Sequence, residues 1–299
     1  MNDQDDEDSD CELIGDERAW AHLEGGIPAY GQGYGSGFRS QLQRAIWGDN
    51  EDDLLYDAPS AKRQRKAQRD KRQFITRDQF FELYDAVCFA NSRGWVMNVT
   101  VDIQPGNLGI VGHDEIFKTF RIWLARYRDW CSQRHIESIY IYLWERPPDR
   151  SLHVHMMCHI PDILQAEFED WAYASIRSLT KPGSLWVAPD IKTRKKATAA
   201  NQWFAFRYRI KGLSPEIYLP GTGPRRALAD QIGVRAEPQG EIGGKRVGSS
   251  RVISWKARRE AQDKATFIPL ACDGDTPADA FWTDMYLRPE HSLTPERLF

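Results

Sequence analysis

The sequence predicts an α+β fold with a largely antiparallel sheet of about five strands and helices packed on one face. Short β-rich segments alternate with longer segments whose apolar residues recur every three or four positions. Two β-rich segments, 139–145 and 152–158, are separated only by a polar stretch with two prolines, which predicts an antiparallel hairpin. With 41% hydrophobic residues, the 299-residue chain can fill a sizeable core.

The predicted domain begins with a helix. Thr76 and Gln79 have the spacing of a capping box, apolar residues follow at helical intervals, and Gly94 stands where the helix should end. Residues 95–101 are rich in β-branched and aromatic types and predict a strand. The clearest helix of the chain is expected at 114–134, where the apolar residues share one face.

The elements after the hairpin continue the alternation. Residues 163–179 form an amphipathic segment and predict a helix, residues 185–188 predict a short strand, and residues 197–211 predict the last helix. Strands and helices therefore interleave around the hairpin, as expected for an α+β sheet.

Regions on either side of this domain differ from it in composition. Residues 1–72 combine acidic, glycine-rich and basic stretches, which favours a flexible region. The basic cluster at 62–72 is either a solvated linker or an arm along DNA phosphates. We expect residues 73–215 to form the main domain and residues 216–299 an extension that packs on that domain or on DNA.

Charge and cysteine content limit the class of protein. Residues 1–17 hold nine acidic residues and no basic one, so the net charge of −3 leaves +6 for the remainder. A mildly basic remainder permits nucleic-acid binding without requiring it. The five cysteines lack CxxC spacing, which disfavours a disulfide framework and favours a reducing cytoplasm. No apolar run approaches the ~20 residues that cross a bilayer, and no secretory signal is evident.

Two histidines on the second strand of the hairpin predict a metal site. Alternate residues of a strand share a face, so His153 and His155 point the same way, close enough to bind one ion. Glu145 ends the preceding strand, and opposite Ser151 or His153 its carboxylate would complete a site of two imidazoles and one carboxylate. Such mixed ligands suit Mg²⁺ or Mn²⁺.

Other interpretations of this site remain open, including a hydrogen-bonded histidine pair that binds no metal. A register shift of one residue would turn Glu145 to the opposite face, in which case Asp102 is the substitute ligand and Asp149 a weaker one. His159 shares the parity of the two histidines but stands where the strand should end, so we interpret it as structural. Cys158 has the opposite parity, which disfavours a zinc site.

Tyr208 and Lys211 lie three residues apart in the last predicted helix, on neighbouring azimuths. A phenolate can attack phosphorus once its proton is removed, and the resulting phosphotyrosine conserves the energy of the broken bond. Lys211 would steady the developing charge. Alternatively, Tyr208 simply ends an aromatic stripe with Trp203, Phe204 and Phe206.

Taken in order, Glu145, His153-Val154-His155 and Tyr208-Arg209-Ile210-Lys211 resemble the motifs of HUH endonucleases of the rolling-circle replication initiator type. Residues 95–102 are loosely similar to the first strand motif of that family, and residues 244–251 to a basic glycine-rich stretch of some plasmid and phage initiators. The likeness covers about 94–259. One departure is Pro147-Pro148, where the family more often has glycine.

The resemblance implies an RRM-like sheet, a divalent metal held by the histidines and Glu145, and nicking of a single-stranded or hairpin origin. Tyr208 would keep the 5′ phosphate and release a 3′ hydroxyl for primer extension. A second tyrosine one turn away is absent, since positions 204 and 212 are Phe204 and Gly212, so a one-tyrosine enzyme is expected. The chain has no GxxxxGK[ST] loop, so a host helicase would act with a host polymerase. A single-tyrosine HUH transposase and a non-catalytic DNA-binding module are the alternatives, and Tyr218 is the alternative nucleophile.

Overall fold

The computed structural model describes residues 73–148, 151–184, 187–193 and 198–287. All of them belong to one compact unit that spans residues 62–299. The predictions for residues 1–72, for Asp149 and for residues 288–299 lie outside the described part of the chain.

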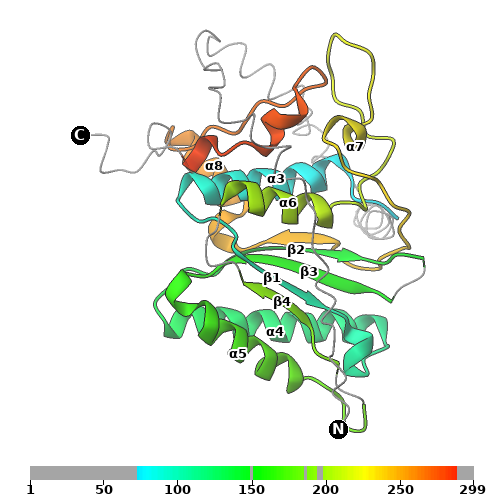
Figure 1. The fold of residues 1–299 in the computed structure, drawn as a ribbon, viewed down its shortest axis with the longest axis vertical. Coiled ribbons are helices and arrows are strands. Elements are labelled where there is room, and N and C mark those ends of the chain that lie inside the picture. Colours follow the sequence, from blue (N-terminus) through cyan, green and yellow to red (C-terminus); the bar gives the residue numbers. More distant parts are fainter. Residues whose placement is uncertain (1–72, 149–150, 185–186, 194–197, 288–299) are drawn as a thin grey trace, which may run out of the picture. The chain divides into compact units, whose positions relative to one another are not determined.

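A five-stranded antiparallel sheet lies at the centre of the fold (Figure 1). Its order is β4-β1-β3-β2-β5, in which β2 and β3 form the predicted hairpin. The first four strands, with helices after β1 and β3, make a βαββαβ unit, and β5 extends the sheet beside β2. The α+β class and the antiparallel sheet are therefore confirmed. The strands are β1 (Val99–Ile103), β2 (Ile139–Glu145), β3 (His153–His159), β4 (Asp190–Thr193) and β5 (Val247–Ser249).

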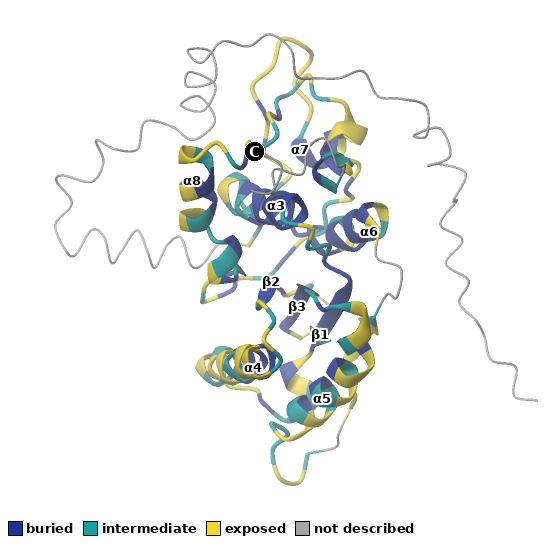
Figure 2. Ribbon diagram, turned by 90° about the vertical axis from the view of Figure 1, so that its left-hand side faces the viewer, coloured by how far each residue is buried: buried dark blue, intermediate teal, exposed yellow. Residues whose placement is uncertain are grey.

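Helices cover both faces of the sheet, so the prediction of helices on one face only is wrong (Figures 1 and 2). The helices α4 (His113–Gln133) and α5 (Gln165–Arg177) pack on one face, and α3 (Arg77–Ser92) and α6 (Ala199–Arg209) on the other. The reason is visible along β3, where Met156 belongs to the first core and Met157 to the second. Neighbouring strand residues point to opposite faces, and both are buried.

The start of α3 follows the predicted capping box. The hydroxyl of Thr76 accepts from the backbone amide of Gln79 at 3.3 Å, and the side chain of Gln79 accepts from the amide of Thr76 at 3.0 Å. Just beyond the helix, Gly94 has a φ of +76°, a conformation that residues with a Cβ rarely adopt. Both ends of this helix are therefore encoded locally.

Strand β4 is displaced from its predicted place at 185–188. Residues 187–189 are not in a strand, residues 185–186 lie outside the described part, and β4 runs from Asp190 to Thr193. Within the described part of the chain, this short edge strand pairs only with β1, and of its own residues it buries only Ile191, opposite Val101. One buried residue leaves too weak a pattern to locate a strand by periodicity.

The chain continues well past α6, so the prediction that residues 197–211 form the last helix is wrong. The helices α7 (Leu228–Gln231) and α8 (Trp255–Asp263) follow, and Phe267, Phe281 and Trp282 pack into the core that α3 and α6 share. Among the described residues, no helix combines the length and the apolar character needed to span a membrane. Short 3₁₀ helices lie at Pro105–Leu108, Asp162–Leu164, Arg251–Ile253, Ala278–Trp282 and Met285–Leu287.

Candidate metal centre and its neighbouring tyrosine

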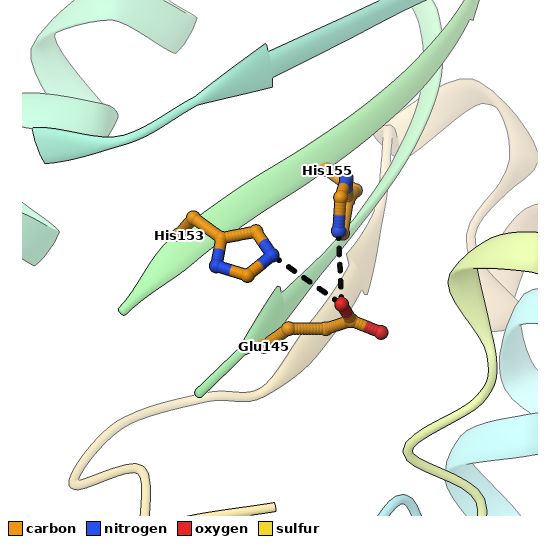
Figure 3. A group of neighbouring side chains, drawn as sticks. All are labelled: Glu145, His153 and His155. Atoms are coloured by element: carbon orange, nitrogen blue, oxygen red, sulfur yellow. Dashed lines mark hydrogen bonds and ion pairs between the residues drawn. The ribbon is translucent and has the colours of Figure 1, made fainter. Parts of the chain in front are cut away.

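Three side chains of the β2-β3 hairpin meet on the sheet face that α3 and α6 cover (Figure 3). Glu145 lies directly opposite His153 in the antiparallel register, so its carboxylate falls on the histidine face as predicted. Glu145, His153 and His155 are 2%, 7% and 5% exposed. Their ligand atoms all lie within 4.8 Å of one another, so this buried group could hold a metal ion.

Contacts on the far side of each imidazole fix the nitrogen that faces the cluster. Nδ1 of His153 lies 2.9 Å from the carbonyl oxygen of Ser151, and Nδ1 of His155 lies 2.8 Å from Oδ1 of Asp102. A carbonyl and an ionised carboxylate can only accept, so the contact of His153 places a proton on its Nδ1, and the ion pair with Asp102 favours a proton on Nδ1 of His155. In a neutral imidazole, Nε2 then presents a lone pair to the cluster. This tautomer is the one that binds a metal through Nε2.

The two Nε2 atoms converge on one oxygen of Glu145. They lie 3.3 Å (His153) and 3.0 Å (His155) from its Oε2. Lone pairs repel a carboxylate oxygen, so the arrangement requires either extra protons on the imidazoles or a cation among the three groups. The other carboxylate oxygen, Oε1, is buried and has no hydrogen-bond partner within the described residues. A divalent cation satisfies all of these atoms together.

The electrostatics favour a cation at this point. Burial raises the pKa of Glu145, but its interactions with the two histidines outweigh burial and lower that pKa to about 2. Burial likewise raises the pKa of Asp102, and its interactions with His155 and Arg209 lower it to about 2. Burial lowers the pKa of His155, yet the two carboxylates together raise it above the ordinary value. Two ionised, largely buried carboxylates thus attract positive charge to the imidazoles.

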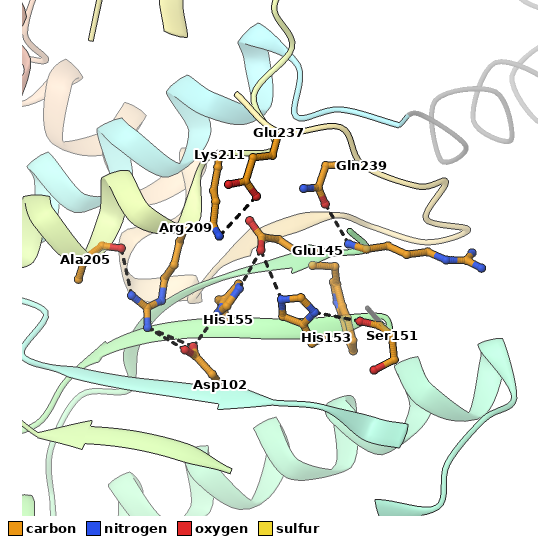
Figure 4. Close-up of polar contacts among 12 residues, drawn as sticks. Asp102, Glu145, Ser151, His153, His155, Ala205, Arg209, Lys211, Glu237 and Gln239 are labelled. Carbon is orange, nitrogen blue, oxygen red and sulfur yellow. Dashed lines mark hydrogen bonds and ion pairs between the residues drawn. The ribbon is translucent and has the colours of Figure 1, made fainter. Parts of the chain in front are cut away.

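Asp102 lies beside the cluster and contacts a ligand instead of replacing one. It sits opposite His155 in the β1-β3 register. Both of its oxygens accept from Nη2 of Arg209 at 3.1 Å (Figure 4). Because Glu145 occupies the third position of the cluster, Asp102 serves to orient His155 and to pair with α6.

Arg209 is the main site residue that sequence reasoning missed. It is 5% exposed, and Nη1 donates to the carbonyl of Ala205 at 3.0 Å. The available signal was its place on α6, since Arg209 falls three residues after the buried Phe206, on the apolar stripe of the helix. An arginine on a buried stripe needs an acidic or carbonyl partner.

Tyr208 lies outside the core. It is 52% exposed, whereas Trp203 and Phe206 are buried, so Tyr208 does not extend the buried aromatic stripe. Within the described residues, no hydrogen bond joins its hydroxyl to Glu145, His153 or His155. The structure therefore leaves the phenol open to solvent.

Lys211 lies beyond the end of α6 at Arg209, so its expected place on the helix is wrong. Its Nζ is nevertheless 4.3 Å from the centre of the Tyr208 ring, and 3.6 Å from Oε2 of Glu237. Figure 4 shows the Lys211 side chain extending from this turn toward the sheet face that carries the histidines. The ammonium of Lys211 therefore contacts the ring of Tyr208, and the chemical roles of the two residues stay predictions.

His159 and Cys158 both lie outside the cluster of Glu145, His153 and His155. Nδ1 of His159 lies 2.8 Å from the carbonyl of Val96, outside the cluster. Burial lowers the pKa of His159, as for a neutral structural histidine. Cys158 is buried in the core on the α4-α5 face, opposite the histidines, so it does not join them in a zinc site.

From the sequence, eight basic residues of the segment 216–299 are suited to DNA phosphates but equally ordinary for a solvated helix, and in the structure they divide into two groups. Arg246 and Arg258 are buried, which contradicts a phosphate role for them. Arg246 donates to the carbonyls of Trp144 and Gly240. Burial lowers the pKa of Arg246 to about 10, and the attraction to Glu145 opposes this shift only in part. Arg258 pairs with Glu82 of α3. The remaining arginines and lysines of this set are exposed, and their contact with DNA stays a prediction: Arg225, Arg226, Lys245, Arg251, Lys256 and Arg259.

No family model, characterised protein sequence or solved structure matches the chain. The similarity to HUH endonucleases therefore stays a prediction from sequence motifs, and the geometry of Glu145, His153 and His155 carries the functional argument.

Proposed function

We propose that the protein nicks and rejoins single-stranded DNA at a replication origin, as an HUH-type endonuclease with one catalytic tyrosine. The observation that carries this proposal is the pair of Nε2 atoms converging on Glu145, each imidazole being oriented from behind. The helix that bears Tyr208 packs on the same sheet face. A possible cation site, and a helix on the same face that carries an exposed phenol, supply the groups that such a reaction needs.

In the proposed reaction, the phenol of Tyr208 loses its proton to solvent and the resulting phenolate attacks the scissile phosphorus. A bond forms between the tyrosine oxygen and phosphorus, and the bond from phosphorus to the 3′ oxygen breaks. The 3′ oxygen takes up a proton, and the 5′ phosphate stays on Tyr208 until a 3′ hydroxyl attacks in the reverse direction. When bound, a divalent cation such as Mg²⁺ or Mn²⁺ supplies polarisation of a phosphate oxygen.

The position of Lys211 and the exposure of Tyr208 each support one part of this reaction. The ammonium of Lys211, 4.3 Å from the Tyr208 ring centre, is placed to steady the negative charge that develops on the phosphate. The exposure of Tyr208 suits a polymeric substrate, which cannot enter an enclosed pocket. Continued unwinding and synthesis at the nick, as in rolling-circle replication of a plasmid or phage, are assigned to a host helicase and polymerase.

A covalent-adduct assay tests the proposal. The full-length protein is incubated with a pool of random single-stranded and hairpin oligonucleotides and Mn²⁺, and denatured adducts are recovered and sequenced. We expect an adduct whose phosphotyrosine maps to Tyr208 by mass spectrometry. It should vanish in Tyr208→Phe and in the His153→Ala/His155→Ala double variant, and persist in the control Tyr218→Phe, which is similarly exposed.

Two outcomes contradict this proposal. An adduct that survives Tyr208→Phe would move the nucleophile elsewhere. DNA binding by the wild type without any adduct would favour a non-catalytic DNA-binding module, in which the histidines form a hydrogen-bonded pair.

A further inference from the structure

Arg209 connects the helix of the proposed nucleophile to a proposed metal ligand. It follows Tyr208 directly in the chain, and its Nη2 donates to both oxygens of Asp102 at 3.1 Å. Asp102 in turn contacts Nδ1 of His155 at 2.8 Å. Figure 4 shows these three side chains in a continuous row from α6 to β3.

We propose that Arg209 is a positioning residue, which fixes the register of α6 on the sheet and thereby the place of Tyr208 relative to His153 and His155. This inference rests on the proposed function and deepens it. It assigns a role to a residue that carries no chemistry itself and does not reach the cluster directly.

Apolar packing alone does not fix that register. The contacts of Trp203 and Phe206 with the core are non-directional, and ridges of one helix can occupy alternative grooves in the layer below. The Arg209 guanidinium is different, because it is buried and becomes unpaired if the helix slides or turns. The planar fork of arginine makes this a directional constraint that the flexible ammonium of lysine does not reproduce.

Burial makes the constraint strict. Nη1 of Arg209 is already bonded to the carbonyl of Ala205, one turn earlier on the same helix. The side chain is therefore held against its own helix and presents Nη2 to Asp102. A displacement of α6 moves Arg209 and Tyr208 together, and a misplacement of about 1 Å in a reacting group can slow a reaction about 100-fold.

The test compares Arg209→Lys with wild type in the full-length protein. Arg207→Lys is the matched control, since Arg207 flanks Tyr208 on the other side and donates to the carbonyl of Gly233 instead. We expect Arg209→Lys to bind Mn²⁺ within about twofold of wild type by calorimetry, and to form the DNA adduct about 100-fold more slowly at saturating oligonucleotide. The oligonucleotide concentration at half-maximal rate should be unchanged, and Arg207→Lys should match wild type.

A second measurement does not depend on nicking. 3-Fluorotyrosine is incorporated at position 208 alone, and the paramagnetic broadening of its ¹⁹F signal by bound Mn²⁺ reports how Tyr208 sits relative to the metal. We expect strong broadening in wild type and in Arg207→Lys, and weaker or heterogeneous broadening in Arg209→Lys and Arg209→Met. A structural role limited to overall stability would lower the melting temperature without changing this signal.

The outcomes separate this inference from the proposed function. Equal adduct rates and equal broadening in wild type and Arg209→Lys overturn the positioning role. Broadening that depends on Arg209 in a wild type that forms no adduct refutes nicking but supports the positioning role. Absence of Mn²⁺ broadening in the wild type overturns both, because Tyr208 then has no fixed relation to a bound metal.

Discussion

The two faces of the sheet bury different kinds of side chain. The face under α4 and α5 is filled by apolar and aromatic residues, with Trp123, Tyr127 and Phe168 among those that are fully buried. The face under α3 and α6 has its own apolar core but also holds the cluster of Glu145, His153 and His155. One face thus serves stability alone, and the other combines stability with the chemistry that we propose.

The largest effect is expected from breaking the purely apolar face. Trp123 is fully buried and packs against Phe120, Tyr127 and Trp171. Trp123→Ala should lower the free energy of unfolding by about 3–5 kcal/mol, measured by urea denaturation, because it leaves a cavity and removes these contacts. Mn²⁺ affinity of the folded fraction should be unchanged. A large loss of metal affinity would show that the two faces are coupled.

The other face contains a buried carboxyl group outside the cluster, whose titration should change stability. Burial raises the pKa of Asp85 on α3 from 3.8 to about 7. The folded state therefore favours the protonated form. The contribution of Asp85 to the free energy of unfolding is therefore fully present below about pH 4, and it is lost as the pH rises through about 7.

Asp85→Asn should abolish this dependence, because asparagine stays neutral. The difference in the free energy of unfolding between the variant and wild type should rise by up to roughly 4 kcal/mol, in favour of the variant, as the pH is raised from 4 to 8. Urea denaturation at both pH values measures the difference, and the titration of all other groups cancels in the comparison. A stability difference that does not vary with pH would show that Asp85 titrates normally.

A bound metal should stabilise the face that carries the cluster. At a Mn²⁺ concentration 100 times the dissociation constant, the free energy of unfolding should rise by about 2.7 kcal/mol. The His153→Ala/His155→Ala variant should lose this response in thermal denaturation. His159→Asn should keep it, because His159 lies on the same strand but outside the cluster. Equal stabilisation of all three proteins would place the metal elsewhere.

The smallest effect is expected at the edge of the same face, where α3 begins. Thr76→Ala removes the hydroxyl that accepts from the amide of Gln79 and should lower stability by about 1 kcal/mol. Thr76→Ser is the control, since it keeps the acceptor. If both variants lose stability equally, the methyl group and not the cap accounts for the change.

Features encoded by neighbouring residues could be predicted from the sequence. The capping box of α3, the amphipathic α4 and the hairpin all depend on spacing within one segment. The short connection between β2 and β3 also limits the register, which is why Glu145 could be expected opposite Ser151 or His153, and the structure selects His153.

Features that depend on distant partners could not be predicted in this way. Arg209 is 107 positions from Asp102, and nothing near either residue marks the other as its partner. From the sequence alone, Arg246 and Arg258 are expected at the surface, because their burial depends on contacts with Trp144 and Glu82, which are far away in the chain. The second layer of helices is a different case, because residues of both parities along β3 are apolar or form the cluster, and this local pattern already indicates a sheet that is buried on both faces.

The position of the cluster on a hairpin has a consequence for how the protein is assembled. Glu145 and His155 are close in sequence and become neighbours as soon as β2 pairs with β3, so bringing them together requires closure of only a short loop. Tyr208 emerges from the ribosome later, and α6 can dock only after a far longer loop has closed. During synthesis, the three side chains of the cluster can therefore come together before the tyrosine is present.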